Sequence, residues 1–354
     1  MLIQKGMVEK MNSEFLNALN EIEKEKNISK DILLDAIDAA LVSAYKRNYN
    51  TNQSNVLVNI DRDTGSVKVF ICKEVVETVE DPLCQIALDD ARAISGSYEL
   101  GDVVNIEDTP AAFGRIAAQT AKQVVLQRIK EAERNLIYDE FSEKEHKVVI
   151  GTIQRIEKRN IYLDIGKTEA YLAPSEQVPG EAYEFHKRLK VYVTEVKKTT
   201  KGPVVNVSRT RPALVAKLFA EEIPEIADGV VEVKSVSREA GSRTKIAVWS
   251  NDKNVDAIGA CIGARGTRVQ NVVDELGGEK IDIVRYSEDP AEFIRASLNP
   301  AEVISLDVNV EEKEAHVVVP HHQLSLAIGK EGQNARLAAR LTGYKIDIKS
   351  DAEN

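Results

Sequence analysis

The sequence predicts a multidomain α+β protein, and three observations support this. Its 354 residues exceed the roughly 100–200 residues of a typical single domain. Helical periodicity dominates the first third of the chain, short strand-like runs follow, and the last part contains an internal repeat. Apolar residues make up 43% and charged residues 29%, which is typical of globular proteins and not of disordered chains.

The first domain is expected to span residues 11–145 and to combine helices with a small sheet in an α/β arrangement. Apolar residues recur at helical spacing in residues 12–27 and 30–47. An Asp-Thr-Gly sequence at residues 63–65 separates two runs of alternating apolar and polar residues, which indicates a β-hairpin. The alternation predicts strands at residues 55–60, 66–75 and 102–107.

A long helix is expected to connect this domain to the next one. Thr109 and Pro110 are typical of a helix start, since Thr is a good cap and Pro is tolerated at the first helical position. The helical pattern continues to Glu145 and becomes polar towards its end. At 1.5 Å per residue such a helix would span roughly 50 Å, which suits a connector.

Residues 146–210 predict a small closed barrel. Glycine and proline residues punctuate this segment and separate five strand-like runs, at residues 148–156, 161–165, 168–172, 190–196 and 204–208. Five strands at this spacing indicate an OB fold. OB barrels bind single-stranded nucleic acids with a basic groove and exposed aromatic rings.

The same segment is the one part of the chain in which basic side chains outnumber acidic ones, although the whole chain carries a net charge of −10. A run of charges alone is more often a solvated surface, and a tyrosine is more often part of a core than a stacking platform. In combination with the barrel pattern, four residues are candidates for RNA contacts: Arg155, Arg159, Tyr162 and Tyr171.

The last 140 or so residues contain two copies of one unit. Each copy is predicted to run helix, strand, strand, helix, Gly-x-x-Gly loop, helix, strand, and each ends on Lys-Ile-Asp-Ile. The first copy is expected at residues 211–287 and the second at 288–350. A single Gly-x-x-Gly is weak evidence because glycine is common in turns, but two copies in matching register are strong evidence for the KH arrangement.

A Gly-x-x-Gly turn brings the backbone close to a ligand, and the helix that follows offers free N–H groups and a positive dipole end to a phosphate. In the KH arrangement this loop holds the backbone of about four nucleotides. Glu331 is acidic and partly offsets Lys330, so the second loop is expected to bind phosphate more weakly. The candidate RNA-binding residues are Gly263, Ala264, Arg265, Gly266, Arg268, Gly329, Lys330, Glu331, Gly332, Gln333, Asn334 and Arg336.

No sequence pattern indicates catalysis, a cofactor or a metal site, so we expect a protein without catalytic residues. A G-x-x-x-x-G-K-[ST] phosphate loop and a G-x-G-x-x-G dinucleotide fingerprint are both missing. His321 and His322 lack partners at ligand spacing and are expected on the surface. The three cysteines show no paired spacing, and no apolar run is long enough to span a membrane, which fits a cytoplasmic protein without a membrane partner.

The chain resembles the NusA family of bacterial transcription elongation and termination factors. The most specific segment is residues 324–340, LSLAIGKEGQNARLAAR, followed by LTGYKIDI. Further matching segments lie at residues 113–119, 208–210, 241–248, 254–256, 259–263 and 287–294. The resemblance covers about residues 11–349.

The resemblance implies an N-terminal domain that binds RNA polymerase, an S-one-type OB barrel and two prokaryotic-type KH domains. It implies binding beside the RNA exit channel of bacterial RNA polymerase, where the family prolongs pausing, promotes intrinsic termination and joins antitermination assemblies with other Nus factors. The residues independently favour binding of nascent single-stranded RNA, whereas the polymerase contact follows from the resemblance alone. Nothing in the sequence demands an oligomer, so we expect a monomer.

Two other functions remain open at this point. An RNA-processing enzyme of the polynucleotide phosphorylase type also carries KH and OB modules, but there KH precedes OB and both follow a large catalytic core. Here the barrel precedes two KH units, and the first domain is too short for such a core. A ribosome-associated RNA-binding protein would instead co-sediment with ribosomal subunits.

Overall fold

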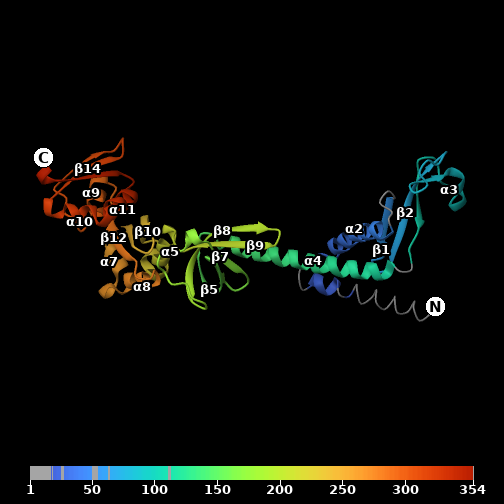
Figure 1. The fold of residues 1–354 in the computed structure, drawn as a ribbon, viewed down its shortest axis with the longest axis horizontal. Helices are drawn as coiled ribbons and strands as arrows, with labels where there is room; N and C mark the ends of the chain where they lie inside the picture. The colour runs from blue at the N-terminus through green and yellow to red at the C-terminus, as the bar shows by residue number, and fades with distance from the viewer. Residues whose placement is uncertain are drawn as a thin grey trace. The chain divides into compact units, whose positions relative to one another are not determined.

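The computed structural model describes residue 17 and residues 19–24, 28–49, 55–62, 64–110 and 113–353 (Figure 1). The chain divides into two compact units, residues 1–136 and 137–354. The first unit contains a four-stranded sheet, and the second contains a closed barrel and two three-stranded sheets. Among the described helices, none has the length and the apolar run that a bilayer crossing requires.

The first unit combines helices with a sheet whose central strand is β2. Its elements in chain order are α2 (Lys30–Tyr49), β1 (Asn55–Ile60), β2 (Val67–Val76), β3 (Gln85–Ala87), α3 (Leu88–Ile94), β4 (Val103–Glu107) and α4 (Phe113–Ser142). Strands β1 and β4 pair with β2 antiparallel, and the short β3 pairs with it in parallel. Helix α2 and strands β1, β2 and β4 are therefore built from the segments in which the sequence predicted them.

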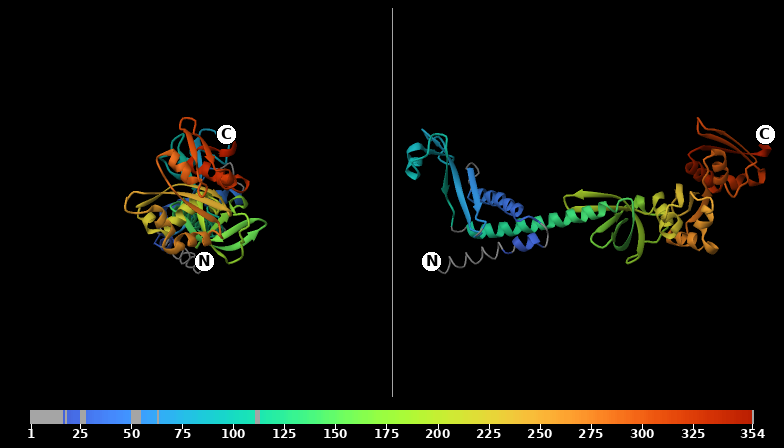
Figure 2. Two further views of the ribbon diagram at one scale, coloured as in Figure 1. Left: turned by 90° about the vertical axis from the view of Figure 1, so that its left-hand side faces the viewer. Right: turned by 180° about the vertical axis from the view of Figure 1, so that it is seen from behind.

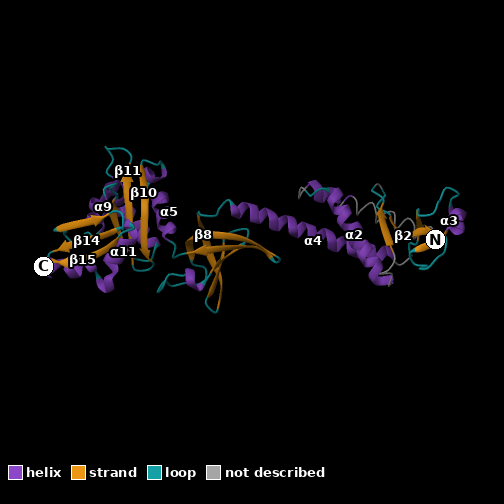
Figure 3. Ribbon diagram, turned by 90° about the horizontal axis from the view of Figure 1, so that it is seen from above, coloured by secondary structure: helices purple, strands orange, loops and turns teal. Residues whose placement is uncertain are grey.

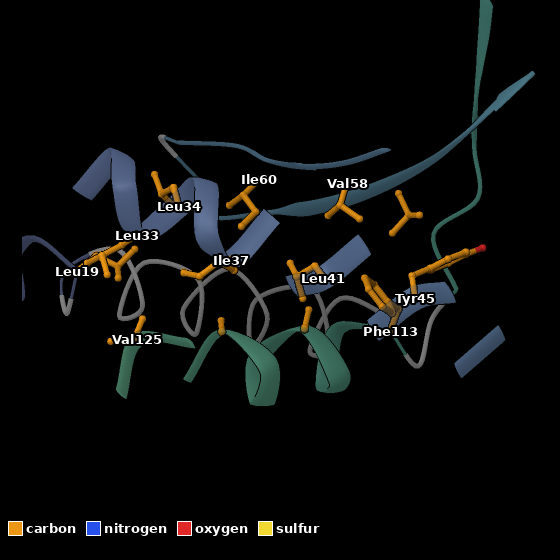
Figure 4. Close-up of a cluster of buried hydrophobic side chains, with 13 residues drawn as sticks. Leu19, Leu33, Leu34, Ile37, Leu41, Tyr45, Val58, Ile60, Phe113 and Val125 are labelled. Atoms are coloured by element: carbon orange, nitrogen blue, oxygen red, sulfur yellow. The ribbon is translucent and has the colours of Figure 1, made fainter. Parts of the chain in front are cut away.

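The core of the first unit lies between α2, β1 and the start of α4. Apolar residues of α2 at helical spacing, among them Leu33, Ile37 and Leu41, are fully buried. Figure 4 shows α2 between β1 and α4, with these side chains directed toward Phe113 and Val125 of α4. The apolar residues in the first turns of α4 pack on this core, and the later turns, which do not, have a more polar sequence.

In the first unit, the predicted start of α2 and the predicted bounds of β1, β2 and β4 agree with the structure to within one residue. Of the helix predicted at residues 12–27, residues 17 and 19–24 are helical and the others lie outside the described residues, as does Asp63 of the hairpin turn. The sequence did not indicate β3 and α3, because three residues of strand and seven of helix are too short for a periodic pattern.

Pro110, the predicted first residue of the connector helix, is not helical, and the described part of this helix starts at Phe113. The hydroxyl of Thr109 accepts a hydrogen bond from the backbone N–H of Val69 at 3.0 Å, so this residue is bonded to the neighbouring strand β2. The helix ends at Ser142, three residues before the predicted end. Its last turns contribute Ile137, Tyr138 and Phe141 to the packing of the barrel.

The barrel of the second unit is closed, with the strand order β5-β6-β7-β9-β8. Its strands are β5 (Val148–Glu157), β6 (Asn160–Asp164), β7 (Glu169–Leu172), β8 (Arg188–Thr199) and β9 (Gly202–Ser208). Alternate residues of each strand, such as Ile161 and Leu163 of β6, are buried inside it. The five strands that the sequence predicted are therefore confirmed (Figures 1 and 2).

The two KH domains follow the barrel and share one topology. The first contains α5 (Pro212–Glu222), α6 (Pro224–Ala227), β10 (Val231–Glu239), β11 (Arg243–Ser250), α7 (Ala257–Ile262), α8 (Thr267–Glu275) and β12 (Lys280–Arg285). The second contains α9 (Pro290–Ser297), β13 (Ser305–Asn309), β14 (Glu314–Val319), α10 (Leu324–Ile328), α11 (Gln333–Thr342) and β15 (Lys345–Ser350). In both, the first two strands pair antiparallel and the second and third pair in parallel.

The second KH domain packs on the sheet of the first. Figure 3 shows β10 and β11 with α5 on one side and α9 and α11 on the other. Ala247 and Val284 of the first domain form an apolar cluster with Phe293 and Leu341 of the second. The hydroxyl of Ser235 also donates a hydrogen bond to the carbonyl of Leu341 at 3.0 Å. The two KH loops are thus carried by one packed pair of domains.

A buried arginine joins the barrel to the first KH domain. The guanidinium of Arg209 is fully buried and forms ion pairs with Glu181 of the barrel and Glu275 of α8. It also donates hydrogen bonds to the carbonyls of Lys190 at 2.8 Å and of Glu275 at 2.9 Å. Because both carboxylates and both carbonyls converge on one charge, the barrel and the KH pair are held in one arrangement.

Candidate nucleic-acid interface

The two glycine loops have the same backbone conformation. Gly263 has φ 73° and ψ 178°, and Gly329 has φ 77° and ψ 171°. The third residue of each loop is also left-handed although it carries a side chain: Arg265 has φ 56° and ψ 25°, and Glu331 has φ 55° and ψ 25°. Two sequences that differ in charge therefore adopt one loop geometry, which is what a shared binding element requires.

The first glycine of each loop is required by close packing as well as by its backbone angles. A Cβ on Gly263 would lie 2.7 Å from Cγ of Arg268, and one on Gly329 would lie 2.8 Å from the backbone nitrogen of Asn334. A Cβ on Gly266 would meet nothing within 4 Å, and its φ of 78° and ψ of 12° are ordinary left-handed values. The two glycines of one loop thus serve different purposes.

We expect Gly263→Ala to be much more destabilising than Gly266→Ala. The first places a side chain in a backbone region that is essentially restricted to glycine and overlaps Arg268, at a cost of about 3 kcal/mol. The second incurs only left-handed strain, at a cost of about 1 kcal/mol. Urea unfolding of the full chain, followed by circular dichroism, measures both. Equal costs would show that the contact with Arg268 relaxes without penalty.

The tips of both loops are open to solvent and carry free cations. Ala264, Arg265, Lys330 and Glu331 are exposed. Neither Arg265 nor Lys330 forms an ion pair or a side-chain hydrogen bond with any residue that the structure describes. Each loop leads directly into α8 or α11, whose first-turn N–H groups can donate to an anionic ligand.

Arg268 of the first loop is engaged within the protein. Its guanidinium donates hydrogen bonds to Glu225 of α6 at 2.9 Å and to the carbonyl of Ala260 in α7 at 2.8 Å. It lies across Gly263 and holds the loop against α7. The structure therefore gives this side chain a positioning task, and its contact with RNA stays a prediction.

Three candidates of the second loop also have partners within the protein. Arg336 and Gln333 both donate hydrogen bonds to the carboxylate of Glu239 in the first KH domain, at 2.7 and 2.9 Å. These hydrogen bonds hold the pKa of Glu239 below its usual range. Asn334 is buried and donates to the carbonyls of Leu298 and Ala327. The second loop is thus fixed to the first KH domain through α11.

Of the four barrel candidates, three form a cluster and the fourth, Arg159, lies outside it. Arg155, Tyr162 and Tyr171 lie directly opposite one another on β5, β6 and β7. The guanidinium of Arg155 stacks on the ring of Tyr162 at 3.9 Å, and the rings of Tyr162 and Tyr171 lie 5.5 Å apart. Arg159 is exposed in the turn between β5 and β6, where its carbonyl accepts a hydrogen bond from Gln177.

We name the row of Arg155, Tyr162 and Tyr171 the aromatic ladder. It forms an outward face of half-buried rings next to a cation, an arrangement that stacks nucleobases. Arg155 also pairs with Glu157 and with Glu169, the latter at 3.2 Å, so its charge is partly neutralised. The ladder is therefore better suited to bases than to phosphates.

A groove of about 620 Å³ beside the ladder was not predicted from the sequence. Tyr171 lines it together with His146, Tyr192, Asn206 and Arg211. These residues come from the end of the connector, three barrel strands and the start of α5, so no spacing in the sequence brings them together. A fold-level prediction of the closed barrel is the only signal that could have located them.

The described part of the chain offers no candidate metal centre, and the buried thiol of Cys261 is not reactive. Among the described residues, no three or more His, Cys, Asp or Glu side chains are grouped so that they could hold a metal ion. Burial raises the pKa of the Cys261 thiol to about 12, so this thiol is not a nucleophile at neutral pH. His321 and His322 are exposed in the turn that precedes α10.

Family models cover the chain in the order of its domains. A NusA N-terminal domain matches residues 14–135, an S1 RNA binding domain residues 142–208, a NusA-like first KH domain residues 209–286 and a NusA-like second KH domain residues 290–354. Curated relatives match over nearly the full length. The chain belongs to the NusA family.

NusA relatives from several bacteria are similar to this chain. The transcription termination/antitermination protein NusA of Halalkalibacterium halodurans is 57% identical over 97% of this chain and 90% of its own length. That of Bacillus subtilis is 56% identical, over 97% and 92%, and that of Thermus thermophilus is 43% identical, over 96% and 90%. The solution structure of the NusA N-terminal domain from B. subtilis covers 35% of this chain and 98% of its own, at 57% identity and a TM-score of 0.33.

Proposed function

We propose that this protein is a non-enzymatic transcription factor of bacteria that binds RNA polymerase near the RNA exit channel and also binds the nascent RNA. In this role it modulates pausing, intrinsic termination and antitermination. The observation that carries the proposal is the pair of glycine loops, which share one backbone geometry and present Arg265 and Lys330 without partners among the described residues. The names of the NusA relatives support the transcriptional part.

We assign the RNA to three places in the second unit. The two loops would hold phosphates through Ala264, Arg265, Lys330 and the N–H groups that follow them, and the aromatic ladder would stack bases. Because buried contacts such as those of Arg209 join the barrel to the KH pair, weak individual sites share one strand at high effective concentration. Tight binding therefore needs no single strong site.

The first unit is assigned to the polymerase. Its described residues include large apolar side chains that are about half exposed and come from α3, β4 and their connections: Leu83, Ile94, Leu100 and Val103. Large apolar side chains that stay exposed are common where a protein binds a partner, which supports this assignment. The other Nus factors remain proposed partners, and we propose a cytoplasmic monomer. The domain limits at residues 145, 210 and 287 stay predictions.

Neither alternative from the sequence gains support. Family membership and the order of barrel and KH domains do not favour an RNA-processing enzyme subunit or a ribosome-associated protein.

Single-round transcription with bacterial RNA polymerase tests the function, on a template with a hairpin pause and an intrinsic terminator. The full chain is compared with residues 137–354, which retain Ile137, Tyr138 and Phe141 and hence the packing of the barrel. We expect the full chain to lengthen the pause and the shorter chain to have no such effect while it still binds RNA. Unchanged pausing with the full chain, at concentrations where it binds RNA, would contradict the polymerase contact.

A further inference from the structure

The groove of about 620 Å³ between the barrel and the start of α5 is not used by either KH loop. Its volume lies within the range of about 300–1,000 Å³ that small-ligand sites occupy. One wall is formed by His146 and Tyr192, whose ring centroids lie 6.2 Å apart and whose Nδ1 and hydroxyl groups lie 3.2 Å apart. The ring of Tyr192 also packs against the core of the first KH domain, so this wall is fixed.

The groove continues the aromatic ladder. Tyr171 lies opposite Tyr162 on one neighbouring strand and opposite Asn206 on the other. Residues directly opposite each other on paired strands share one face of the sheet, so the side chains of Tyr162, Tyr171 and Asn206 all point outward from the barrel. Tyr171 thus belongs both to the ladder and to the wall of the groove, and a strand stacked on the ladder reaches the groove without leaving the surface.

Two polar groups in the groove have no partner. Neither the side-chain amide of Asn206 nor the hydroxyl of Ser175 forms a hydrogen bond with any residue in the described part of the chain. An amide presents a donor and an acceptor side by side, which matches the edge of a nucleobase. Aromatic walls with such groups at their side are the usual means by which proteins recognise an unstacked RNA base.

The acidic side chains of the groove do not oppose RNA, because each is paired with a cation. Glu176 accepts from Arg211 at 2.8 Å, and Glu195 pairs with Lys197 at 2.9 Å. The guanidinium of Arg211 remains more than half exposed, so it can also face a phosphate. The groove therefore presents rings and neutral hydrogen-bonding groups with little net charge.

We propose that this groove binds one unstacked base of the single-stranded RNA, with the base against His146 and Tyr192 and its edge on Asn206 and Ser175. The proposal rests on the proposed function and adds a site outside the KH loops. It makes the junction of the barrel and the first KH domain a fourth point of attachment for the strand, next to the aromatic ladder.

Fluorescence titration of the full chain with oligo(A) and oligo(U) tests this site. We expect the double variant Ser175→Ala/Asn206→Ala to bind the preferred oligonucleotide about tenfold more weakly, because it cannot form two hydrogen bonds to the base. Gln154→Ala is the matched control, since it removes an amide from the same barrel outside the groove. His146→Ala is a second variant, and we expect it to weaken binding as well. Because the ring of His146 is exposed, this test still applies if the double variant does not fold.

Cross-linking locates the base. Oligo(U) that contains 4-thiouridine is irradiated with the full chain, and we expect cross-linked peptides that include Tyr192 or Asn206. Unchanged affinity of the groove variants, while Arg265→Glu weakens binding, would overturn the groove and leave the proposed function intact. Loss of binding in the Gln154→Ala control to the same extent would also overturn it. If the unaltered chain binds neither oligonucleotide, the proposed function fails first.

Discussion

Replacing Arg238 with methionine is expected to lower the free energy of unfolding by about 3–5 kcal/mol, because it leaves a buried carboxylate without its counter-charge. The side chains of Arg238 and Glu279 are both fully buried and form a two-pronged ion pair, with nitrogen–oxygen distances of 2.9 Å. Arg238 also donates to the carbonyls of Arg209 and Arg211 at 2.7 and 3.1 Å. The change therefore also releases the link between the barrel and the first KH domain.

A double variant separates the effect of charge from the effect of packing. In Arg238→Met/Glu279→Gln the buried charge is gone. Thr244 and the backbone N–H of Gly241 donate to the two different oxygens of Glu279, at 2.6 and 2.8 Å. The glutamine oxygen can accept from Gly241, while its NH2 group can donate to the hydroxyl of Thr244. We expect it to be more stable than Arg238→Met alone. Urea denaturation of the two variants and the unaltered chain measures the three free energies of unfolding. A double variant as unstable as the single one would mean that shape, and not charge, dominates.

These buried ion pairs could not be predicted from the sequence. Arg209 was counted with the basic side chains of residues 146–210, and Arg238 was not singled out, since charge counts do not distinguish an exposed arginine from a buried one. Their partners Glu181, Glu275 and Glu279 lie far away in the chain. Only the packing of the barrel on the first KH domain, and the folding of that domain itself, brings such pairs together.

The repeat, in contrast, was predictable because its signal is local. Two glycines at fixed spacing between helical patterns determine a turn, and the strands that flank it show in their own periodicity. Barrel strands were predictable for the same reason. The short β3 and α3 were not, because three residues of strand and seven of helix show no periodic pattern.

The sequence placed the candidate residues in or beside the loops, but it did not show which of them contact other parts of the protein. Spacing placed Arg265 and Arg336 beside the loops, yet the structure leaves the first exposed and bonds the second to Glu239 of the neighbouring domain. A cation next to a glycine loop can bind a ligand or hold the loop in place. The local sequence does not distinguish these two roles. The difference is set by where the second KH domain docks.

Charge at the third position of each loop is expected to control RNA affinity, and Arg265→Glu tests this. Glu331 occupies the same position of the second loop with the same φ and ψ, so the first loop can adopt this change without backbone strain. Removal of a charged hydrogen bond to phosphate and the added repulsion should weaken binding of single-stranded RNA roughly 10- to 100-fold at low salt. Titration of the full chain at several salt concentrations measures it.

The salt dependence distinguishes the removal of one phosphate-binding cation from a general change in charge. If Arg265 neutralises a phosphate, the slope of log affinity against log salt concentration should become shallower by about 0.7 in Arg265→Glu, because one phosphate keeps its counterions. Ser305→Asp is the control, because it adds a negative charge at an exposed position of β13, a strand that is part of neither loop. We expect it to reduce affinity slightly, by long-range repulsion that salt screens. A slope unchanged in Arg265→Glu, or an equal effect of Ser305→Asp, would remove Arg265 from the RNA path and leave the first loop to act through its backbone N–H groups alone.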